Sequence, residues 1–143
     1  MKRISALVFS LMFLFLTTNF TDAVPVKKDK ATVKVTDGVL AISTSFSSYM
    51  YSLKEGWSVF MDAIVVEDKL AGVMMMKLDK DDKPFDIVML SGTNLNGEPK
   101  IIPFPKSNPQ NAGLYKHYEK IVEDFVKKHK VKEIIQKYKV TYI

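Results

Sequence analysis

The sequence predicts a mostly β fold with one C-terminal helix, in which an antiparallel meander curls into a complete or partial barrel and the helix packs outside. Three observations predict it. Apolar and polar residues alternate with period 2 over much of residues 33–104, turn-forming residues separate the alternating segments, and the period changes to 3.6 from Leu114 onward. The same pattern allows an alternative, an open α+β sheet with the helix on one face.

The first 23 residues are typical of a secretory signal. Lys2 and Arg3 precede an apolar run from Ile4 to Leu16, and Thr21-Asp22-Ala23 follows with small residues where a signal peptidase cleaves. The apolar run is shorter than the roughly 20 residues that span a bilayer. We therefore expect cleavage near Ala23 and a secreted protein (periplasmic if bacterial). Residues 24–143 should form a single domain without a membrane span.

Composition excludes several classes of protein for the chain after cleavage. It has no cysteine, which rules out a disulfide framework and thiolate metal sites. Its 19 cationic side chains are all lysines, because Arg3 lies in the signal, and its net charge is +4. Proteins that read nucleic acids rely on arginine for bidentate contacts, so nucleic acid is not an expected partner.

Strands are predicted in order along the chain. Val33 and Val35 begin a hairpin that turns at Asp37-Gly38, a pair typical of type I′ turns, and continues through Val39–Ser43. The Ser/Tyr-rich segment Thr44–Gly56 is a strand end, a loop or a lid. Further strands are expected at Trp57–Val66, Leu70–Leu78, Phe85–Leu90 and Lys100–Phe104.

The C-terminal part changes to a helical period. Apolar residues from Leu114 to Val126 form one stripe and predict a helix over about 113–130. A second stripe, from Val131 to Tyr138, is out of register with the first, so the helix should break near Lys130. Residues 138–143 (YKVTYI) are predicted to form a closing strand.

Polar residues within the strands indicate which face points outward. Ser58 and Asp62 mark the even-numbered side of their strand as outer, Lys77 marks the odd side of the next, and Asp86 the even side of the third. The opposite sides then form one dry interior. The outer sides also carry large apolar residues, which the helix is expected to cover.

This interior is either a packed core or a cavity for a small hydrophobic molecule, and its methionines suit adaptable apolar contacts. The first hypothesis is a secreted carrier, with Tyr49 and Tyr51 at the mouth of the cavity. The alternative is an inhibitor or adaptor with a solid core, which binds protein through an exposed strand edge. A second copy of the chain could also cover a sheet that is apolar on both sides. The predicted ligand-binding residues are Trp57, Val59, Met61, Met74, Met76, Phe85, Ile87, Met89, Tyr49 and Tyr51.

Two segments resemble the lipocalin family. GWSVFMDAIVVEDKL is similar to a lipocalin hairpin in the middle of the barrel, and LYKHYEKIVEDFVKKHKVKEII to the helix and the segment after it. The resemblance implies a closed antiparallel barrel with a hydrophobic ligand inside and the helix packed outside. The family's early Gly-x-Trp strand, its Thr-Asp-Tyr block and its usual disulfide are absent from this sequence.

No catalytic or metal-binding constellation is recognisable, so neither an enzyme nor a cofactor is predicted. His117 and His129 lie about 120° apart around a helix and cannot share a metal. Asp79, Asp81 and Asp82 do not fit the calcium-binding loop template and read as a solvated turn. Among the carboxylates, Asp62 stands out because it interrupts an apolar strand.

Overall fold

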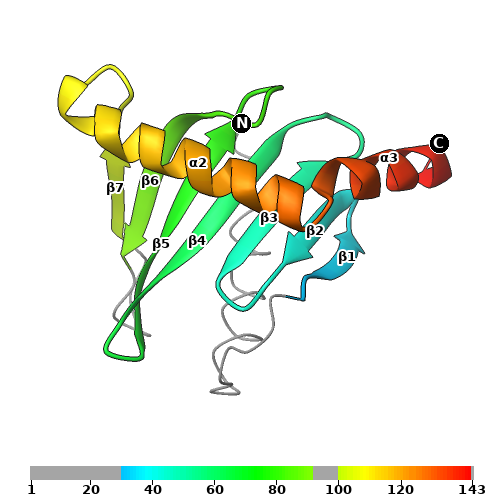
Figure 1. Cartoon of the computed structure of the whole chain (residues 1–143), viewed down its shortest axis with the longest axis horizontal. Coiled ribbons are helices and arrows are strands. Elements are labelled where there is room, and N and C mark those ends of the chain that lie inside the picture. The colour runs from blue at the N-terminus through cyan, green and yellow to red at the C-terminus, as the bar shows by residue number, and fades with distance from the viewer. Residues whose placement is uncertain (1–29, 92–99, 143) are drawn as a thin grey trace.

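The computed structural model describes residues 30–91 and 100–142. They form one seven-stranded antiparallel sheet in which every strand pairs with its neighbours in sequence, followed by helical segments. Both helices cross the same face of the sheet (Figure 1). The strands are β1 (Thr32–Thr36), β2 (Val39–Ser43), β3 (Ser47–Ser52), β4 (Ser58–Val66), β5 (Lys69–Leu78), β6 (Pro84–Ser91) and β7 (Lys100–Phe104). The helical segments are η1 (Pro109–Asn111), α2 (Ala112–Lys128) and α3 (Val131–Tyr142).

The predicted meander and its C-terminal helix are confirmed, but the sheet is not closed into a barrel. β1 and β7 lie at opposite ends of the strand order and do not pair with each other. Helix side chains pack on the sheet where a barrel would hold its own interior, so that face is buried without closure. The architecture is therefore the open sheet with helices on one face.

Local turn chemistry sets the first hairpins. Asp37 and Gly38 join β1 to β2 with φ values of 52° and 78°, and Glu67 and Asp68 join β4 to β5 with 51° and 64°. Two consecutive positive φ values are the requirement of the type I′ turn, whose twist matches the flanking strands. The hairpin predicted at Asp37-Gly38 is confirmed.

The Ser/Tyr-rich segment contains a central strand of the sheet. β3 pairs with β2 on one side and with β4 on the other; Tyr49 and Tyr51 lie on one face with Ser47, and Ser48, Met50 and Ser52 on the other. Tyr49 stands opposite Phe60 on β4, whereas Ser48 stands opposite Met61. The sequence had suggested a strand end, a loop or a lid for this segment, whereas the structure has a separate central strand here.

Gly72 lies where two strands approach closely. The register between β4 and β5 shifts between Ile64 and Val65, and Gly72 faces Ile64 just before this irregularity. A Cβ atom at Gly72 would lie 2.9 Å from the carbonyl oxygen of Leu90 on β6. Glycine therefore allows the β6 backbone to pass at this distance.

The helix-covered face forms the larger core. Its aromatic centre is the edge-to-face pair of Phe60 and Phe125, whose ring centroids are 5.2 Å apart. From the helices, Val122 and Val131 are fully buried, since α2 and α3 both turn their apolar stripes onto the sheet. The buried strand residues of this core are Leu40, Ile42, Tyr49, Phe60, Met74, Met76, Leu78 and Ile87.

The C-terminal segment continues as a helix instead of forming the predicted closing strand. Lys130 has φ 52° and separates α2 from α3, so the predicted break is confirmed. Residues 138–142 belong to α3, and residue 143 lies outside the described residues. The helical conformation is favoured because Val131 and Ile135, one turn apart in α3, both reach the core. A strand would bring only alternate residues to the core.

The opposite face of the sheet, which we call the helix-free face, carries a second apolar cluster. Six of its side chains are at most 3% exposed, and four others pack against them. All lie on β2–β6 or, for Trp57, just before β4, so the described residues provide no second layer for this face. Its residues are Val39, Met50, Val59, Met61, Val73 and Leu90, with Ala41, Trp57, Leu70 and Met75 beside them.

Candidate functional site

The predicted ligand-binding residues do not converge on one interior. Met76 is the cross-strand partner of Phe60, and Met74 that of Asp62, so both methionines lie on the helix-covered face with Ile87 and Met89. Trp57, Val59 and Met61 belong to the cluster on the other face. The predicted common interior is therefore wrong, and the two groups are separated by the sheet itself.

The error arises from Ser58 and Asp62, because the alternation of polar and apolar residues predicts an outer position for both. Both lie on the helix-covered face: Ser58 pairs with Leu78 and is 7% exposed, and Asp62 pairs with Met74. Asp62 is held there because it accepts hydrogen bonds from Ser47 Oγ (2.9 Å) and Tyr118 Oη (3.2 Å). A polar side chain marks an outer face only when the fold gives it no partner inside.

Three other predicted residues also have different places. Phe85 is 48% exposed and does not line a cavity. Tyr49 is a core residue, and its hydroxyl is turned to Asp82 instead of to a mouth. Tyr51 is half-buried, and the Lys139 ammonium lies 5.1 Å from its ring centroid. Neither tyrosine is placed to gate an opening.

Asp82 joins three parts of the chain. Its carboxylate accepts a hydrogen bond from Tyr49 Oη at 2.5 Å and forms an ion pair with Lys132 Nζ at 2.7 Å. Burial, together with the neighbouring carboxylate, raises the pKa of Tyr49 far above its ordinary value, so this hydroxyl donates at any physiological pH. Asp82 is itself buried, which corrects its prediction as part of a solvated turn; Asp79 and Asp81 are exposed.

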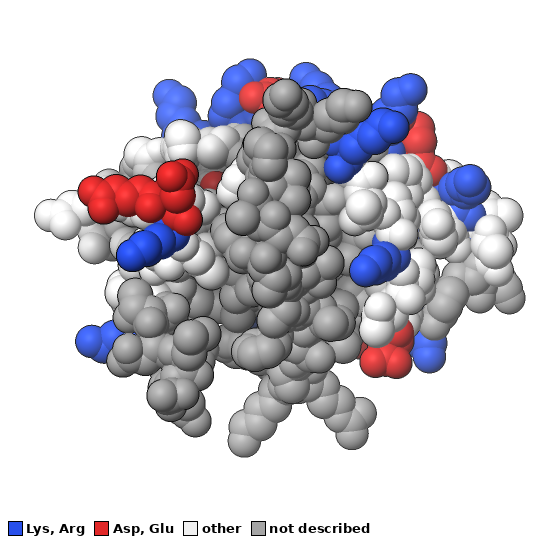
Figure 2. Space-filling view, turned by 90° about the horizontal axis from the view of Figure 1, so that it is seen from below, with Lys and Arg blue, Asp and Glu red and all other residues white. Residues whose placement is uncertain are grey.

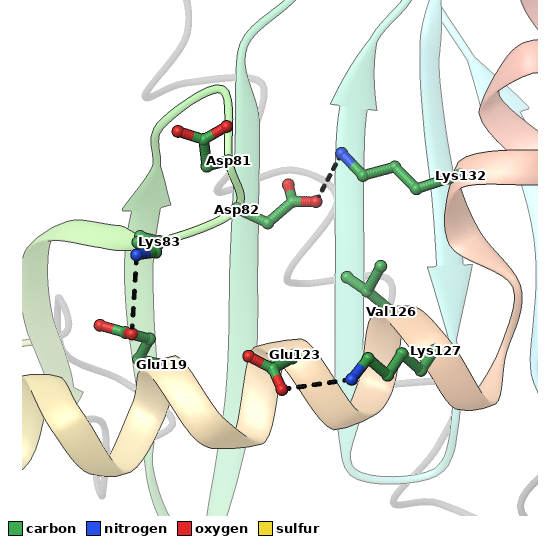
Figure 3. Close-up of a pocket in the computed structure, with 8 residues that line it drawn as sticks. All are labelled: Asp81, Asp82, Lys83, Glu119, Glu123, Val126, Lys127 and Lys132. Atoms are coloured by element: carbon green, nitrogen blue, oxygen red, sulfur yellow. Dashed lines mark hydrogen bonds and ion pairs between the residues drawn. The ribbon is translucent and has the colours of Figure 1, made fainter.

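A pocket of about 160 Å³ lies beside Asp82, between the β5–β6 turn and the helices (Figure 3). Its charged side chains pair with one another: Lys83 with Glu119 at 4.0 Å, Lys127 with Glu123 at 3.4 Å, and Lys132 with Asp82. Ligand sites are typically about 300 Å³ or larger and mostly apolar. This pocket therefore resembles a charged surface groove more than a carrier's cavity. Its lining residues are Asp81, Asp82, Lys83, Glu119, Glu123, Val126, Lys127 and Lys132.

Two helix tyrosines fasten α2 to the sheet. Tyr118 donates to Asp62, and burial raises the pKa of the Asp62 carboxyl above its usual value, although the hydrogen bonds from Ser47 and Tyr118 oppose the rise. Tyr115 Oη donates to the Phe104 carbonyl at 2.6 Å and accepts from the Ile87 amide at 3.1 Å. The signal that could have revealed these contacts is a pair of tyrosines within an apolar helix stripe.

Metal and membrane sites are not found in the described ranges. In residues 30–91 and 100–142, no three histidine or carboxylate side chains are grouped as metal ligands. His117 and His129 instead contact the rings of Tyr118 and Phe125. The helices of this part of the chain are all too short or too polar to span a membrane. Figure 2, which shows the molecule from below, has both lysine and carboxylate side chains on the surface of the described residues.

The helix-free face is the remaining candidate site. One border carries an ion pair between Lys77 Nζ and Asp86 Oδ2 (3.8 Å), and another carries Ser43 and Ser48, whose hydroxyls hydrogen-bond each other at 2.7 Å. Within the apolar area, Trp57 Nε1 is buried and has no hydrogen-bond partner. The face is thus apolar at its centre, with polar groups at two of its borders.

Comparison of the chain with protein-family models, with curated proteins and with solved structures gave no match in any of the three.

Proposed function

We propose that this protein is an exported protein-interaction module that binds an apolar partner surface through its helix-free face. One observation supports the proposal: ten apolar side chains gather on this sheet face, and no helix or strand of residues 30–91 and 100–142 lies over them. Antiparallel sheets that stand alone usually keep one face polar and hydrated. A sheet face made mainly of apolar side chains is expected to pack against another surface.

The rest of the molecule supports a binding role more than catalysis. The carboxylates of Asp62 and Asp82 accept hydrogen bonds from Ser47, Tyr118 and Tyr49, and Asp82 also pairs with Lys132. These contacts join the sheet to the helices and give both carboxylates a structural role.

A photo-crosslinking experiment tests the proposal. A photoreactive residue replaces Met75 on the helix-free face, in the full chain exported by its producing cells. A matched variant carries the same residue at Lys116, an exposed position on α2. We expect a discrete cross-linked protein product from position 75 only. Equal products from both positions, or none from either, would contradict the proposal.

A carrier of small hydrophobic molecules remains a second candidate, now with the ligand on the helix-free face. The observation that favours it is Trp57 Nε1, a buried donor without a partner that a ligand oxygen could accept from. The lipocalin resemblance belongs with this candidate. Titration with fatty acids and retinoids, followed by Trp57 fluorescence, tests it: saturable shifts support a carrier, and an unchanged spectrum of folded protein rejects it.

A further inference from the structure

We infer that the β1 edge of the sheet binds an extended segment of another protein, which adds to the sheet as a strand and places a carboxylate opposite Lys34. This surface is separate from the helix-free face, so the inference goes beyond the proposed function. An extended peptide binds a sheet edge through main-chain hydrogen bonds, and its alternate side chains give the pairing specificity. Three features of β1 fit this mode of binding: outward backbone groups, an exposed valine and an unpaired lysine.

The backbone of β1 points hydrogen-bonding groups away from the sheet at every second residue. The two-residue turn after Thr36 makes Thr36 and Val39 a hydrogen-bonded pair, and the register gives Lys34 and its β2 partner the same role. The amides and carbonyls of Val33 and Val35 therefore point away from β2. Among the described strands none lies on that side, because β1 is the first in the strand order.

The opposite edge of the sheet, β7, is poorly suited to such pairing. Tyr115 Oη lies between the Ile87 amide and the Phe104 carbonyl, so Phe104 belongs to the β7 residues whose backbone groups face β6. Pro103 and, just past the strand, Pro105 then face outward, and proline has no amide hydrogen to donate. Proline commonly blocks edge strands in this way. β1 contains no proline, so both of its outward positions keep an amide donor.

The valines of β1 define the apolar residues that an added strand would carry. Val33 and Val35 lie on the helix-covered face, opposite Ile42 and Leu40 of the larger core. Val33 packs against that core, as Tyr138 of α3 does, whereas Val35 is 41% exposed. α3 lies over the β1 end of the sheet (Figure 1). An added strand with apolar residues on this side would cover Val35 and extend the core at this edge.

Lys34 determines the charge of the partner. It lies in the middle of β1 on the other face, opposite Ala41, and it is exposed. Within residues 30–91 and 100–142 it has no ion-pair partner. A lysine at the centre of an edge strand disfavours pairing with an identical edge, because like charges repel where they lie opposite each other, whereas a carboxylate opposite it is favourable. The partner is therefore an extended segment in which aspartate or glutamate stands between two apolar residues.

A synthetic peptide tests the inference by nuclear magnetic resonance on the exported protein labelled with nitrogen-15. The probe is Gly-Ser-Thr-Val-Glu-Val-Thr-Ser-Gly with blocked ends. At millimolar peptide we expect saturable shifts of the Val33 and Val35 amide signals and about tenfold slower hydrogen exchange at both amides, with no change at Ile101 on β7. The same peptide with N-methyl groups on both valines should not bind, because those amides face β1 when the glutamate lies opposite Lys34.

A charge exchange tests the contact at Lys34. Lys34→Glu should bind the glutamate peptide about fivefold more weakly than the wild type does. The same variant should bind a peptide with lysine in place of glutamate about as tightly as the wild type binds the original. Lys100→Glu, an exposed position on the other edge strand, is the matched control and should leave both affinities unchanged.

Three results would overturn the inference. The first is the absence of any amide shift at millimolar peptide. The second is equal binding of the N-methylated peptide, since strand pairing cannot tolerate the loss of those amides. The third is an equal loss of affinity in Lys34→Glu and Lys100→Glu, because it would show a general effect of charge instead of a contact at the β1 edge.

Discussion

Asp82 occupies a backbone conformation that only a few residue types tolerate, with φ 61°, and it is 8% exposed. Aspartate is among the residues that enter this left-handed region most readily. The turn is also ordered by Asp79, whose carboxylate accepts the amides of Asp81 and Lys83 at 2.8 and 3.0 Å. Together these contacts aim the Asp82 carboxylate at Tyr49 and Lys132.

Substitution of Asp82 should therefore be costly. Asp82→Ala leaves the buried Tyr49 hydroxyl without an acceptor and removes the partner of Lys132, so we expect a loss of about 2–4 kcal/mol in the free energy of unfolding. Urea unfolding measures it. Asp81→Ala, one residue away and exposed, should change this free energy by less than about 0.5 kcal/mol. Equal effects would show that Asp82 is no more than a turn residue.

Asp62 should give the folded protein a pH dependence of a definite sign. Its folded pKa is raised above 3.8, so the folded state binds its proton more tightly than the unfolded chain does. The residue therefore disfavours folding at pH values above its raised pKa, and this penalty disappears as the pH falls toward 3.8. Acidification over that range favours the folded state at this one site.

Asp62→Asn removes this titration while it keeps groups that can bond Ser47 and Tyr118. Relative to the wild type, the variant should be most favoured near neutral pH and should lose that advantage on acidification, within about 1 kcal/mol. Unfolding in urea across that range measures the difference. Asp124→Asn, an exposed carboxylate on α2, is the control. A difference that grows on acidification would contradict the assigned direction.

At the scale of elements, the link between α2 and α3 places a non-glycine residue where glycine is usual. Lys130 has φ 52° just after the C-cap His129, the position at which helices commonly end with a left-handed glycine. The left-handed conformation lets α3 leave the axis of α2 and bring Val131 and Ile135 to the core. A lysine here bears a conformational cost that the packing of α3 offsets.

Lys130→Gly should raise the free energy of unfolding by about 0.5–1 kcal/mol, because glycine adopts this conformation without a Cβ clash. Thermal unfolding monitored by circular dichroism measures the change. The same substitution at Lys116, an exposed position inside α2, should instead lower stability by about 1 kcal/mol. Destabilisation by both would mean that the Lys130 side chain contributes more than its backbone costs.

Much of the element order is readable from the sequence because it depends on near neighbours. Asp37-Gly38 specifies its own hairpin, and the two helical stripes, out of register with each other, predict the break at Lys130. The segment 138–142 was misread because its β-branched residues favour a strand locally, whereas the turns of α3 before it are anchored in the core.

At the scale of the whole molecule, an apolar sheet with helices on only one face couples folding to association. A partner that binds only the folded state raises its apparent stability by mass action.

The sequence alone determined every strand of the meander except β3, the two helical stripes and the presence of large apolar residues on both sides of the sheet, because each depends on spacing within a few residues. Only the tertiary structure decided which side of each strand lies on which face of the sheet. Asp62 lies inside because Tyr118, 56 residues away, donates to it, and Asp82 is buried because Tyr49, 33 residues away, does the same. The cost of burying a carboxylate depends on partners that only the folded chain brings together.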